Sequence, residues 1–462
     1  MAPDWGGVAW LTVLGAWLNG SGRRVAERIT IEALGKVYPG GNQALAEVSL
    51  EVEPSTFLVL LGPSGSGKTT LLRCLAGIER ISSGRIALGG KTVAGGRAHV
   101  PPDQRDLSMV FQDYALWPHL LVRDNVAFAL RRRKLGRAQA RARAGAMLER
   151  VGLGALADRY PNELSGGEQQ RVALARALVA DTGLILCDEP LSNLDADLRE
   201  RMRVEISALV REAAATTVYI THDQAEAFAL ADRVGILEQG RLVQTGTPEE
   251  IYTQPASPFI ARFTGLSGEF PVRLLGPARD GLVEVTPHGA AGAGGAAGGD
   301  ARPFHARAPR DPVGTTALLM IRPTGVKLCP PDTGEHHLRG VVADVAFRGR
   351  GYEHAIDLPG QGRLTGVFSP VRSARGAVAG LRLAPEGCHV FAPPDGIHPD
   401  GTAPDGFPPD GTAPDGTAPD GTVPDGTVPA NGTADATTAG AVAGAAGTAA
   451  ARTGPVVSAR VP

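Results

Sequence analysis

A glycine-rich stretch, Gly62 to Thr69 (GPSGSGKT), has the residue types and spacing of a phosphate-binding loop. It follows the apolar run FLVLL and precedes TLLRCLAGI, which predicts a strand, a tight loop and a helix. Glycines let backbone N–H groups curl around phosphate oxygens, and a helix start adds partial positive charge. We therefore expect a nucleotide to be bound by these residues: Gly62, Pro63, Ser64, Gly65, Ser66, Gly67, Lys68, Thr69 and Thr70.

Two carboxylates close a second apolar run, LILCDEP, and supply the acid and base chemistry that a phosphate loop lacks. Lys68 is spaced to reach the β- and γ-phosphates, and the Thr69 hydroxyl to bind Mg²⁺. Asp188 can hold Mg²⁺ through its waters, and Glu189 can take a proton from an attacking water. An Asp-Glu pair alone is usually the polar end of a buried strand, but next to a phosphate loop it predicts hydrolysis.

A third stretch, LSGGEQQR from Leu164 to Arg171, predicts a second anion site. Ser165 and Glu168 have the S-x-x-E spacing of a capping box at the start of the helix EQQRVALARALV. Gly166 and Gly167 leave the N–H groups of that helix end accessible. One chain needs one phosphate cradle per nucleotide, so the second site favours a nucleotide shared between two chains.

The elements that must carry these residues alternate between strands and helices over residues 25–265. The runs FLVLLG, LILCDEP and TVYITHD are apolar throughout, as in a parallel sheet covered on both faces, and residues 120–160 read as helical. From about residue 266 the helical periodicity gives way to short β-like runs with turn signals. This pattern predicts a small β-barrel or sandwich interrupted by a Gly/Ala loop.

Composition sets limits on the class of protein. The chain has 462 residues, a formal net charge of −2 and 43% hydrophobic residues, which gives no sign of nucleic-acid or anionic-membrane binding. The four scattered cysteines indicate neither a zinc site nor a disulfide framework. We therefore expect a cytosolic chain. The N-terminal WGGVAWLTVLGAWL is too short for a membrane span, which leaves a disordered or wrongly assigned start, or an interfacial helix. From Pro394, PDG recurs with a period of five, which predicts a disordered tail.

The stretch LSGGEQQR resembles the signature sequence of ABC (ATP-binding cassette) ATPases, and further segments match the same family. VFQDYALWPH resembles the Q-loop, LSNLDADL the D-loop and YITHD the switch segment. The resemblance implies that Gln112 touches Mg²⁺ and the attacking water and that His222 bridges the γ-phosphate and Glu189. It also implies that Asp195 lies at a dimer interface and that Tyr38, in GKVYPGG, stacks on adenine.

In this family two cassettes form a head-to-tail dimer in which the phosphate loop of one chain and the signature of the other enclose the same ATP. The resemblance therefore implies a homodimer with ATP and Mg²⁺ as cofactors. Ser165, Gly166, Gly167 and Glu168 would then form the signature side of the partner's ATP site.

The C-terminal part resembles the importer ATPases that carry an OB-like TOBE domain. The segment GTPEEIYTQPASPFIARFTG and the later LMIRPTGVKL carry this resemblance. We divide the chain into an N-terminal extension (1–27), an α/β ABC ATPase domain with a helical subdomain (28–265), a small all-β TOBE-like domain (266–393) and the PDG-repeat tail (394–462).

By this resemblance the chain is the ATPase subunit of an importer, peripheral on the cytoplasmic face of the membrane. It would act on separate permease subunits and indirectly with a solute-binding protein, without nucleic acid. The ferric-iron and polyamine branch looks closest, and sugar, sulfate, thiamine or phosphonate import remains an alternative, as does a soluble ABC ATPase outside transport. DYALWPHLLVRDNVAF is the expected permease contact, with Trp117 and Leu120 either facing the permease or packing internally. The β domain could also be a regulatory module that binds an oxyanion or a protein.

Overall fold

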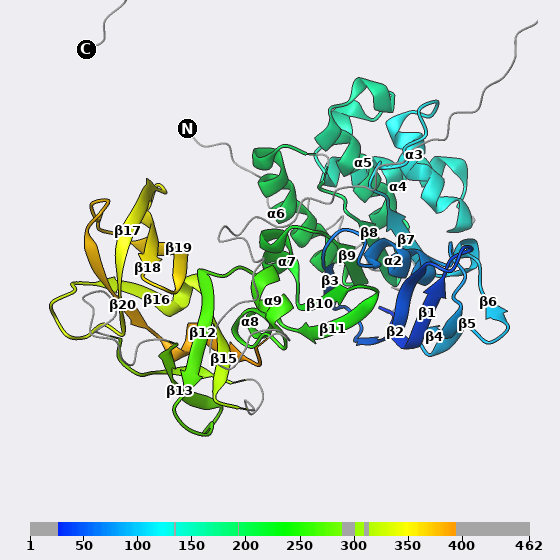
Figure 1. The fold of residues 1–462 in the computed structure, drawn as a ribbon. Helices are drawn as coiled ribbons and strands as arrows, with labels where there is room; N and C mark the ends of the chain where they lie inside the picture. Colours follow the sequence, from blue (N-terminus) through cyan, green and yellow to red (C-terminus); the bar gives the residue numbers. More distant parts are fainter. Residues whose placement is uncertain (1–25, 134, 193, 289–300, 309–313, 394–462) are drawn as a thin grey trace, which may run out of the picture. The chain divides into compact units, whose positions relative to one another are not determined.

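The structure of the chain is a computed structural model that describes residues 26–133, 135–192, 194–288, 301–308 and 314–393 (Figure 1). Nearly all of the predicted N-terminal extension, the Gly/Ala loop and the PDG-repeat tail lie outside these residues. The expectations for those three segments therefore stay predictions.

A parallel sheet forms the centre of the predicted nucleotide-binding half, as the apolar runs predict. Its strand order is β11-β10-β3-β9-β8-β7. Only β11 runs antiparallel to its neighbour. All residues of β3, β8 and β9 are buried, because both faces of the sheet are covered. The bounds are β3 Phe57–Leu61, β7 Leu107–Val110, β8 Leu184–Asp188, β9 Thr216–Ile220, β10 Arg233–Glu238 and β11 Arg241–Gly246.

Each face of this sheet contributes to a different hydrophobic core, because side chains alternate along a strand. Leu58 and Leu60 of β3 pack with a five-stranded antiparallel sheet of order β2-β1-β4-β5-β6 and with α2. Val59 and Leu61 face the other core, with the helices α3 to α7. The bounds are β1 Ile29–Val37, β2 Gln43–Val52, β4 Ser83–Leu88, β5 Lys91–Gly95, β6 Ala98–His99 and α2 Lys68–Ala76.

The predicted helical region is a set of separate helices rather than one long one. Residues 120–160 fold as α3, a 3-10 turn, α4 and a second 3-10 turn, and α5 follows with the signature at its start. The helices are α3 Val122–Phe128, α4 Arg137–Arg150, α5 Gly166–Val179, α6 Ala196–Ala213, α7 Gln224–Leu230, α8 Pro248–Thr253 and α9 Pro258–Phe263. Within the described ranges, no helix is both long and apolar enough to span a membrane.

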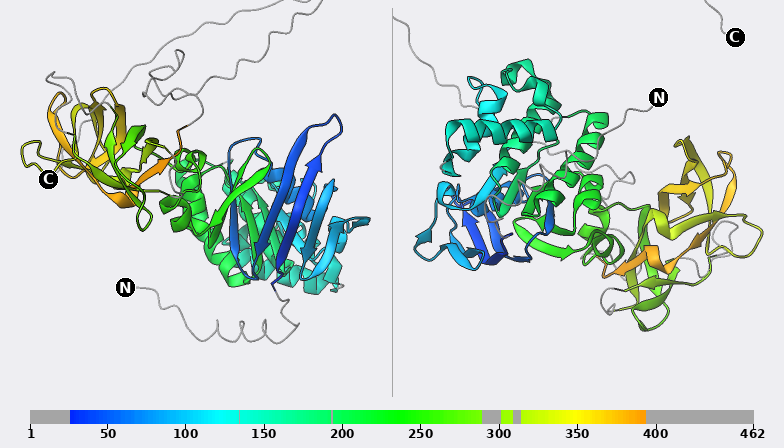
Figure 2. Two further views of the ribbon diagram at one scale, coloured as in Figure 1. Left: turned by 60° about the horizontal axis from the view of Figure 1, so that its bottom comes forward. Right: turned by 180° about the vertical axis from the view of Figure 1, so that it is seen from behind.

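The C-terminal residues fold as β structure, in a richer arrangement than a single small barrel. A closed barrel of order β12-β13-β14-β21-β15 shares one hydrophobic core with a five-stranded antiparallel sheet of order β16-β20-β17-β18-β19. The yellow and orange parts of the ribbon are strands and their connections (Figure 2). The bounds are β12 Gly268–Leu274, β13 Leu282–Pro287, β14 Phe304–Arg307, β15 Thr316–Ile321, β16 Val326–Cys329, β17 Leu338–Phe347, β18 Tyr352–Leu358, β19 Gly362–Ser369, β20 Val378–Leu383 and β21 Cys388–Phe391. The residue pattern indicates the strands but not their division between two sheets.

Candidate nucleotide-binding site

The phosphate loop lies between β3 and α2, which is the context its sequence predicts. Gly65 and Gly67 have positive φ angles of 78° and 98°, a conformation that glycine adopts without strain. A Cβ on Gly67 would lie 2.5 Å from the carbonyl oxygen of Ala44, so no larger residue fits there. The loop backbone is therefore free to curl at the N-terminal end of α2.

Lys68 is folded into this loop. Its Nζ donates to the carbonyl oxygens of Gly62 and Pro63, each at 2.8 Å. Burial lowers the pKa of Lys68, and the charges of Glu189 and Asp188 oppose that change. A buried ammonium group thus interacts electrostatically with Glu189, the expected base, and with Asp188, the expected magnesium ligand.

The expected magnesium ligands meet at the same edge of the sheet. The Thr69 hydroxyl donates to Oδ1 of Asp188 at 3.1 Å, although the two residues are 119 positions apart. Asp188 is the last residue of β8 and only 6% exposed, and its burial raises its pKa while the Thr69 hydrogen bond lowers it. A hydroxyl and a carboxylate oxygen side by side are hard donors of the kind that Mg²⁺ prefers, so the residues present fit that ion.

Glu189 and His222 form the second pair. His222 Nδ1 lies 3.2 Å from Oε2 of Glu189. Glu189 has a positive φ of 43°, so the chain turns sharply after Asp188 and the two adjacent carboxylates leave the strand in different directions. Asp188 is thereby directed to Thr69, and Glu189 to the histidine.

Gln112 and Tyr38 lie at the margins of this site. Gln112 follows β7, whose Val110 pairs in parallel with Cys187, so it lies at the sheet edge where Asp188 and Glu189 are found. The Tyr38 hydroxyl is 3.5 Å from Oγ1 of Thr70, which places its ring beside the first turn of α2. Of the remaining loop residues, Ser66 is buried and Ser64 is exposed.

The signature starts α5, as predicted. The backbone N–H and the hydroxyl of Ser165 both donate to Oε2 of Glu168, each at 2.8 Å, which confirms the capping-box spacing and lowers the pKa of Glu168. The two glycines differ. Gly166 is exposed, whereas Gly167 is buried, and a Cβ on it would meet Leu198 of α6 at 2.8 Å. Gly167 therefore serves helix packing, a reason that the sequence alone did not suggest.

Asp195 also has a local role. It is the N-cap of α6, and its Oδ1 accepts the backbone N–H of Leu198 at 2.9 Å. This contact fixes the start of the helix directly after the candidate D-loop.

Comparison with known proteins agrees with this geometry. The family model described as ABC transporter matches residues 45–192, and the TOBE domain model matches residues 319–391. The Fe(3+) ions import ATP-binding protein FbpC of Rhizobium etli is 42% identical over 330 residues, which cover 71% of this chain and 87% of that protein. The chain belongs to the ABC transporter family. It is an ABC-type ATPase of the importer type with a TOBE domain.

Other relatives of this ABC ATPase carry two kinds of name. The spermidine/putrescine import ATP-binding protein PotA of Thermobifida fusca is 42% identical, over 70% of this chain and 81% of the relative. The FbpC protein of Agrobacterium fabrum is 45% identical, over 71% and 87% respectively. A solved dimeric ATP-binding cassette, MJ0796 in a post-hydrolysis state bound to ADP and Pi, is 29% identical with a TM-score of 0.43, over 48% of this chain and 98% of that chain.

Three residues outside the motifs of this ABC ATPase contact or lie next to the segments that carry the site. Asn125 is fully buried under the segment that follows Gln112. Arg199 and Glu226 line a small pocket together with Glu189 and His222. Nothing local distinguishes them in the sequence, because each owes its role to contacts made across the fold.

Glu226 predicts a pH dependence of stability. Burial raises its pKa above the usual 4.5, and the neighbouring hydroxyls of Thr221 and Tyr219 oppose this rise only in part. The folded chain thus keeps this proton to higher pH than the unfolded chain, so wild-type stability falls as the pH rises through the unfolded value and on to the folded one. A Glu226→Gln chain lacks this loss and should be the more stable of the two near pH 8.

Urea unfolding near pH 4 and near pH 8 measures this difference. The gain in Glu226→Gln should shrink at the lower pH, where the wild-type carboxyl is protonated. Glu249→Gln, at an exposed position of α8, should follow the wild type at both pH values. Equal stability of Glu226→Gln and wild type near pH 8 would show that burial of this carboxyl has no energetic cost.

Proposed function

We propose that this ABC ATPase works as a homodimer that couples ATP binding and hydrolysis to solute import through separate integral-membrane permease subunits. The observation that carries the proposal is the meeting of Lys68, Thr69, Asp188, Glu189 and His222 at one edge of the sheet. These residues come from three separate stretches of sequence, and together they can bind a triphosphate and activate water.

In the proposed reaction Glu189 accepts a proton from the attacking water. His222, in contact with Glu189 at 3.2 Å, keeps that carboxylate oriented, and Lys68 offsets the negative charge that develops on the phosphate. Thr69, Asp188 and Gln112 would hold Mg²⁺, which when bound supplies charge neutralisation at the phosphates.

The dimer is proposed because the signature offers an anion site separate from the phosphate loop. Ser165 and Gly166 are exposed at the N-terminal end of α5, a helix of 14 residues whose dipole favours an anion there. In the proposed head-to-tail dimer this helix end faces the γ-phosphate held by the partner's Lys68. Asp195, at the start of α6, would lie at the same interface.

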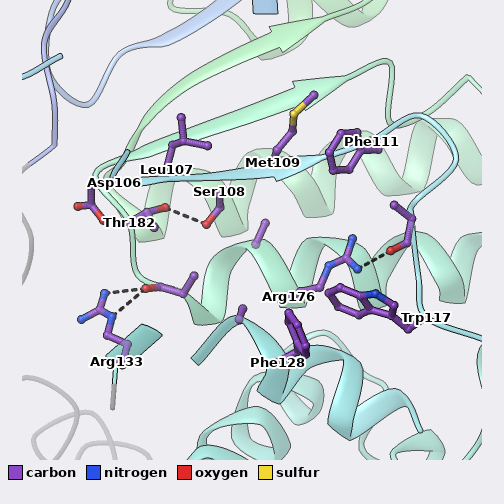
Figure 3. Close-up of a pocket in the computed structure, with 14 residues that line it drawn as sticks. Asp106, Leu107, Ser108, Met109, Phe111, Trp117, Phe128, Arg133, Arg176 and Thr182 are labelled. Atoms are coloured by element: carbon purple, nitrogen blue, oxygen red, sulfur yellow. Dashed lines mark hydrogen bonds between the residues drawn. The ribbon is translucent and has the colours of Figure 1, made fainter. Parts of the chain in front are cut away.

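A cavity of about 460 Å³ lies between β7, the end of α3 and α5 (Figure 3). This cavity supports a permease contact. Trp117 lines it and also packs internally, with its ring 4.2 Å from that of Phe128 and 5.0 Å from the Arg176 guanidinium. Arg176 donates to the carbonyl oxygens of Tyr114 and Ala115, which ties the segment after Gln112 to α5. We propose that a permease element docks here, so that a movement of Gln112 at the nucleotide site changes its contact with the permease.

Asn125 holds this docking segment in shape. Its Oδ1 accepts the backbone N–H of Trp117 at 2.8 Å. Its Nδ2 donates to the carbonyl oxygens of Trp117 and Leu120 at 3.1 and 3.0 Å. Asn125→Leu keeps the branched shape of the side chain but leaves buried backbone groups unpaired. We expect it to lower the free energy of unfolding by about 2–3 kcal/mol and to weaken permease binding, with ATP affinity retained.

Urea unfolding and capture of the permease by the purified variant measure the two effects. Asn162→Leu, at an exposed position just before the signature, is the matched control and should change neither. An Asn125→Leu chain with wild-type stability and permease binding would mean that the segment holds its shape without this side chain.

The proposed cargo is ferric iron or a polyamine, since the named relatives divide between these two. The test is uptake of labelled ferric iron and labelled spermidine by the native host lacking this chain, with wild type or Glu189→Gln restored. One of the two uptakes should return with wild type and not with Glu189→Gln. If neither iron uptake nor spermidine uptake depends on the chain, the cargo is one of the other solutes. ATP hydrolysis by the purified chain is measured separately, so this result leaves the proposed ATPase reaction untouched. The proposed location is the cytoplasmic face of the membrane.

A further inference from the structure

Arg199 joins two segments that flank the candidate catalytic residues. It lies one turn into α6, directly after the D-loop, and its Nη2 donates to the carbonyl oxygen of Leu194 at 2.9 Å. Its Nη1 lies 3.8 Å from Oδ2 of Asp223, the residue that follows His222. One guanidinium thus contacts both the D-loop and the switch segment.

Asp223 can pass this contact on to the histidine because it is itself fixed at the start of α7. Its Oδ1 accepts the backbone N–H of Glu226, and its own N–H donates to Oγ1 of Thr221, each at 3.0 Å. Thr221 and Asp223 therefore hold the backbone on both sides of His222. A displacement of Asp223 would move the imidazole relative to Glu189.

The pocket behind the catalytic pair contains the same group. Glu189, His222, Asp223 and Arg199 all line it, and the buried Glu226 carboxyl forms part of its wall. Arg199 brings a positive charge to a wall that otherwise carries three carboxyl groups. Removing the Arg199 charge would leave the negative charge of Asp223 without its ion-pair partner next to the Glu226 carboxyl.

We propose that Arg199 is a positioning residue that transmits the state of the D-loop to His222. When the D-loop contacts its partner chain, the bond from Arg199 to Leu194 fixes the guanidinium, and the ion pair with Asp223 fixes the switch segment. His222 is then held against Glu189 in the closed dimer. This inference rests on the proposed homodimer, because the D-loop is the segment that the partner would contact.

Arg203 provides a matched control on the same helix. It also reaches α7, through a hydrogen bond from Nη1 to the carbonyl oxygen of Ala225 at 3.3 Å, and it pairs with Glu200. These contacts involve neither Leu194 nor Asp223. Loss of Arg203 therefore removes a contact between α6 and α7 without breaking the proposed link.

The test compares Arg199→Ala, Arg199→Lys, Asp223→Asn and Arg203→Ala in the full-length chain. Arg199→Ala should lower kcat for ATP hydrolysis about tenfold while KM changes less than about twofold, because the nucleotide contacts remain. Arg199→Lys should recover part of kcat, and Arg203→Ala should match wild type. Asp223→Asn keeps the helix cap but loses the charge, so the double variant with Arg199→Ala should be no slower than the more damaged single variant.

A second readout is independent of turnover and of dimer formation. In the chain without nucleotide, Arg199→Ala should raise amide hydrogen exchange in the peptides that contain Leu194 and Asp223, and Arg203→Ala should not. Wild-type exchange in Arg199→Ala, or kcat losses that multiply in the double variant, would overturn the link. Raised exchange with unchanged kcat would overturn its role in hydrolysis. Failure of the homodimer itself would instead appear as a wild-type chain whose hydrolysis rate per chain is independent of protein concentration.

Discussion

A Glu189→Gln chain is expected to bind ATP as wild type does and to hydrolyse it at least about 10²-fold more slowly. The amide keeps the shape of the carboxylate but cannot accept the proton of the attacking water. Lys68 and the loop glycines are unchanged, so the phosphate contacts survive. Phosphate release and equilibrium ATP binding measure the two effects separately.

The same variant should accumulate as an ATP-bound dimer, because hydrolysis, the step that we propose reopens the head-to-tail dimer, is blocked. Gel filtration with and without ATP and Mg²⁺ detects this. Glu249→Gln, which changes the same chemical group at an exposed position of α8, should turn over like wild type. Hydrolysis near the wild-type rate by Glu189→Gln would mean that another group is the base.

Ser165→Arg is expected to abolish turnover by the dimer while leaving ATP binding to the single chain intact. The added side chain would occupy the exposed N-terminal end of α5, where the partner's γ-phosphate is proposed to lie. Lys68→Ala, in contrast, damages the phosphate loop itself, so it should weaken both ATP binding and turnover. Each of the two variants alone should be nearly inactive.

Mixing these two variants distinguishes a shared site from a site within one chain. In a mixed head-to-tail dimer, one site combines both defects and the other combines the intact loop with the intact signature. Random mixing should therefore restore activity, to at most about a quarter of the wild type. Asn162→Arg, an exposed neighbour of the signature, is the control for added charge and should be active alone.

A mixture that stays at the level of the separate variants would contradict the shared site. So would loss of ATP binding in the Ser165→Arg chain alone, since that would place the signature next to the phosphate loop of its own chain.

Much of the fold and the gathering of the candidate site could be predicted from the sequence because local chemistry encodes them. The phosphate loop needs glycine at fixed positions, and the buried parallel strands read as unbroken apolar runs. These two signals are enough to expect Thr69 and Asp188 at one sheet edge, and the structure brings them to 3.1 Å.

What could not be predicted depends on contacts between distant segments. Gly167 read as a ligand-facing glycine because its packing partner, Leu198, lies on another helix. Asn125 lies inside the expected permease contact, but its role there could not be predicted, since the loop it holds comes from earlier in the chain. Arg199 is one of several arginines on α6, and only the fold shows that it reaches Asp223. The C-terminal strands and a small barrel could be expected, but the second five-stranded sheet that shares the barrel's core could not.

The most direct test of the central claim is to identify what the proposed ATP-bound dimer holds in the membrane. Tagged Glu189→Gln is expressed in the native host, the membranes are solubilised with ATP and Mg²⁺, and the co-purifying proteins are identified by mass spectrometry, with Glu249→Gln as the matched sample. A polytopic permease retained by Glu189→Gln is the predicted result. Recovery of soluble partners or ribosomes alone would contradict the importer account.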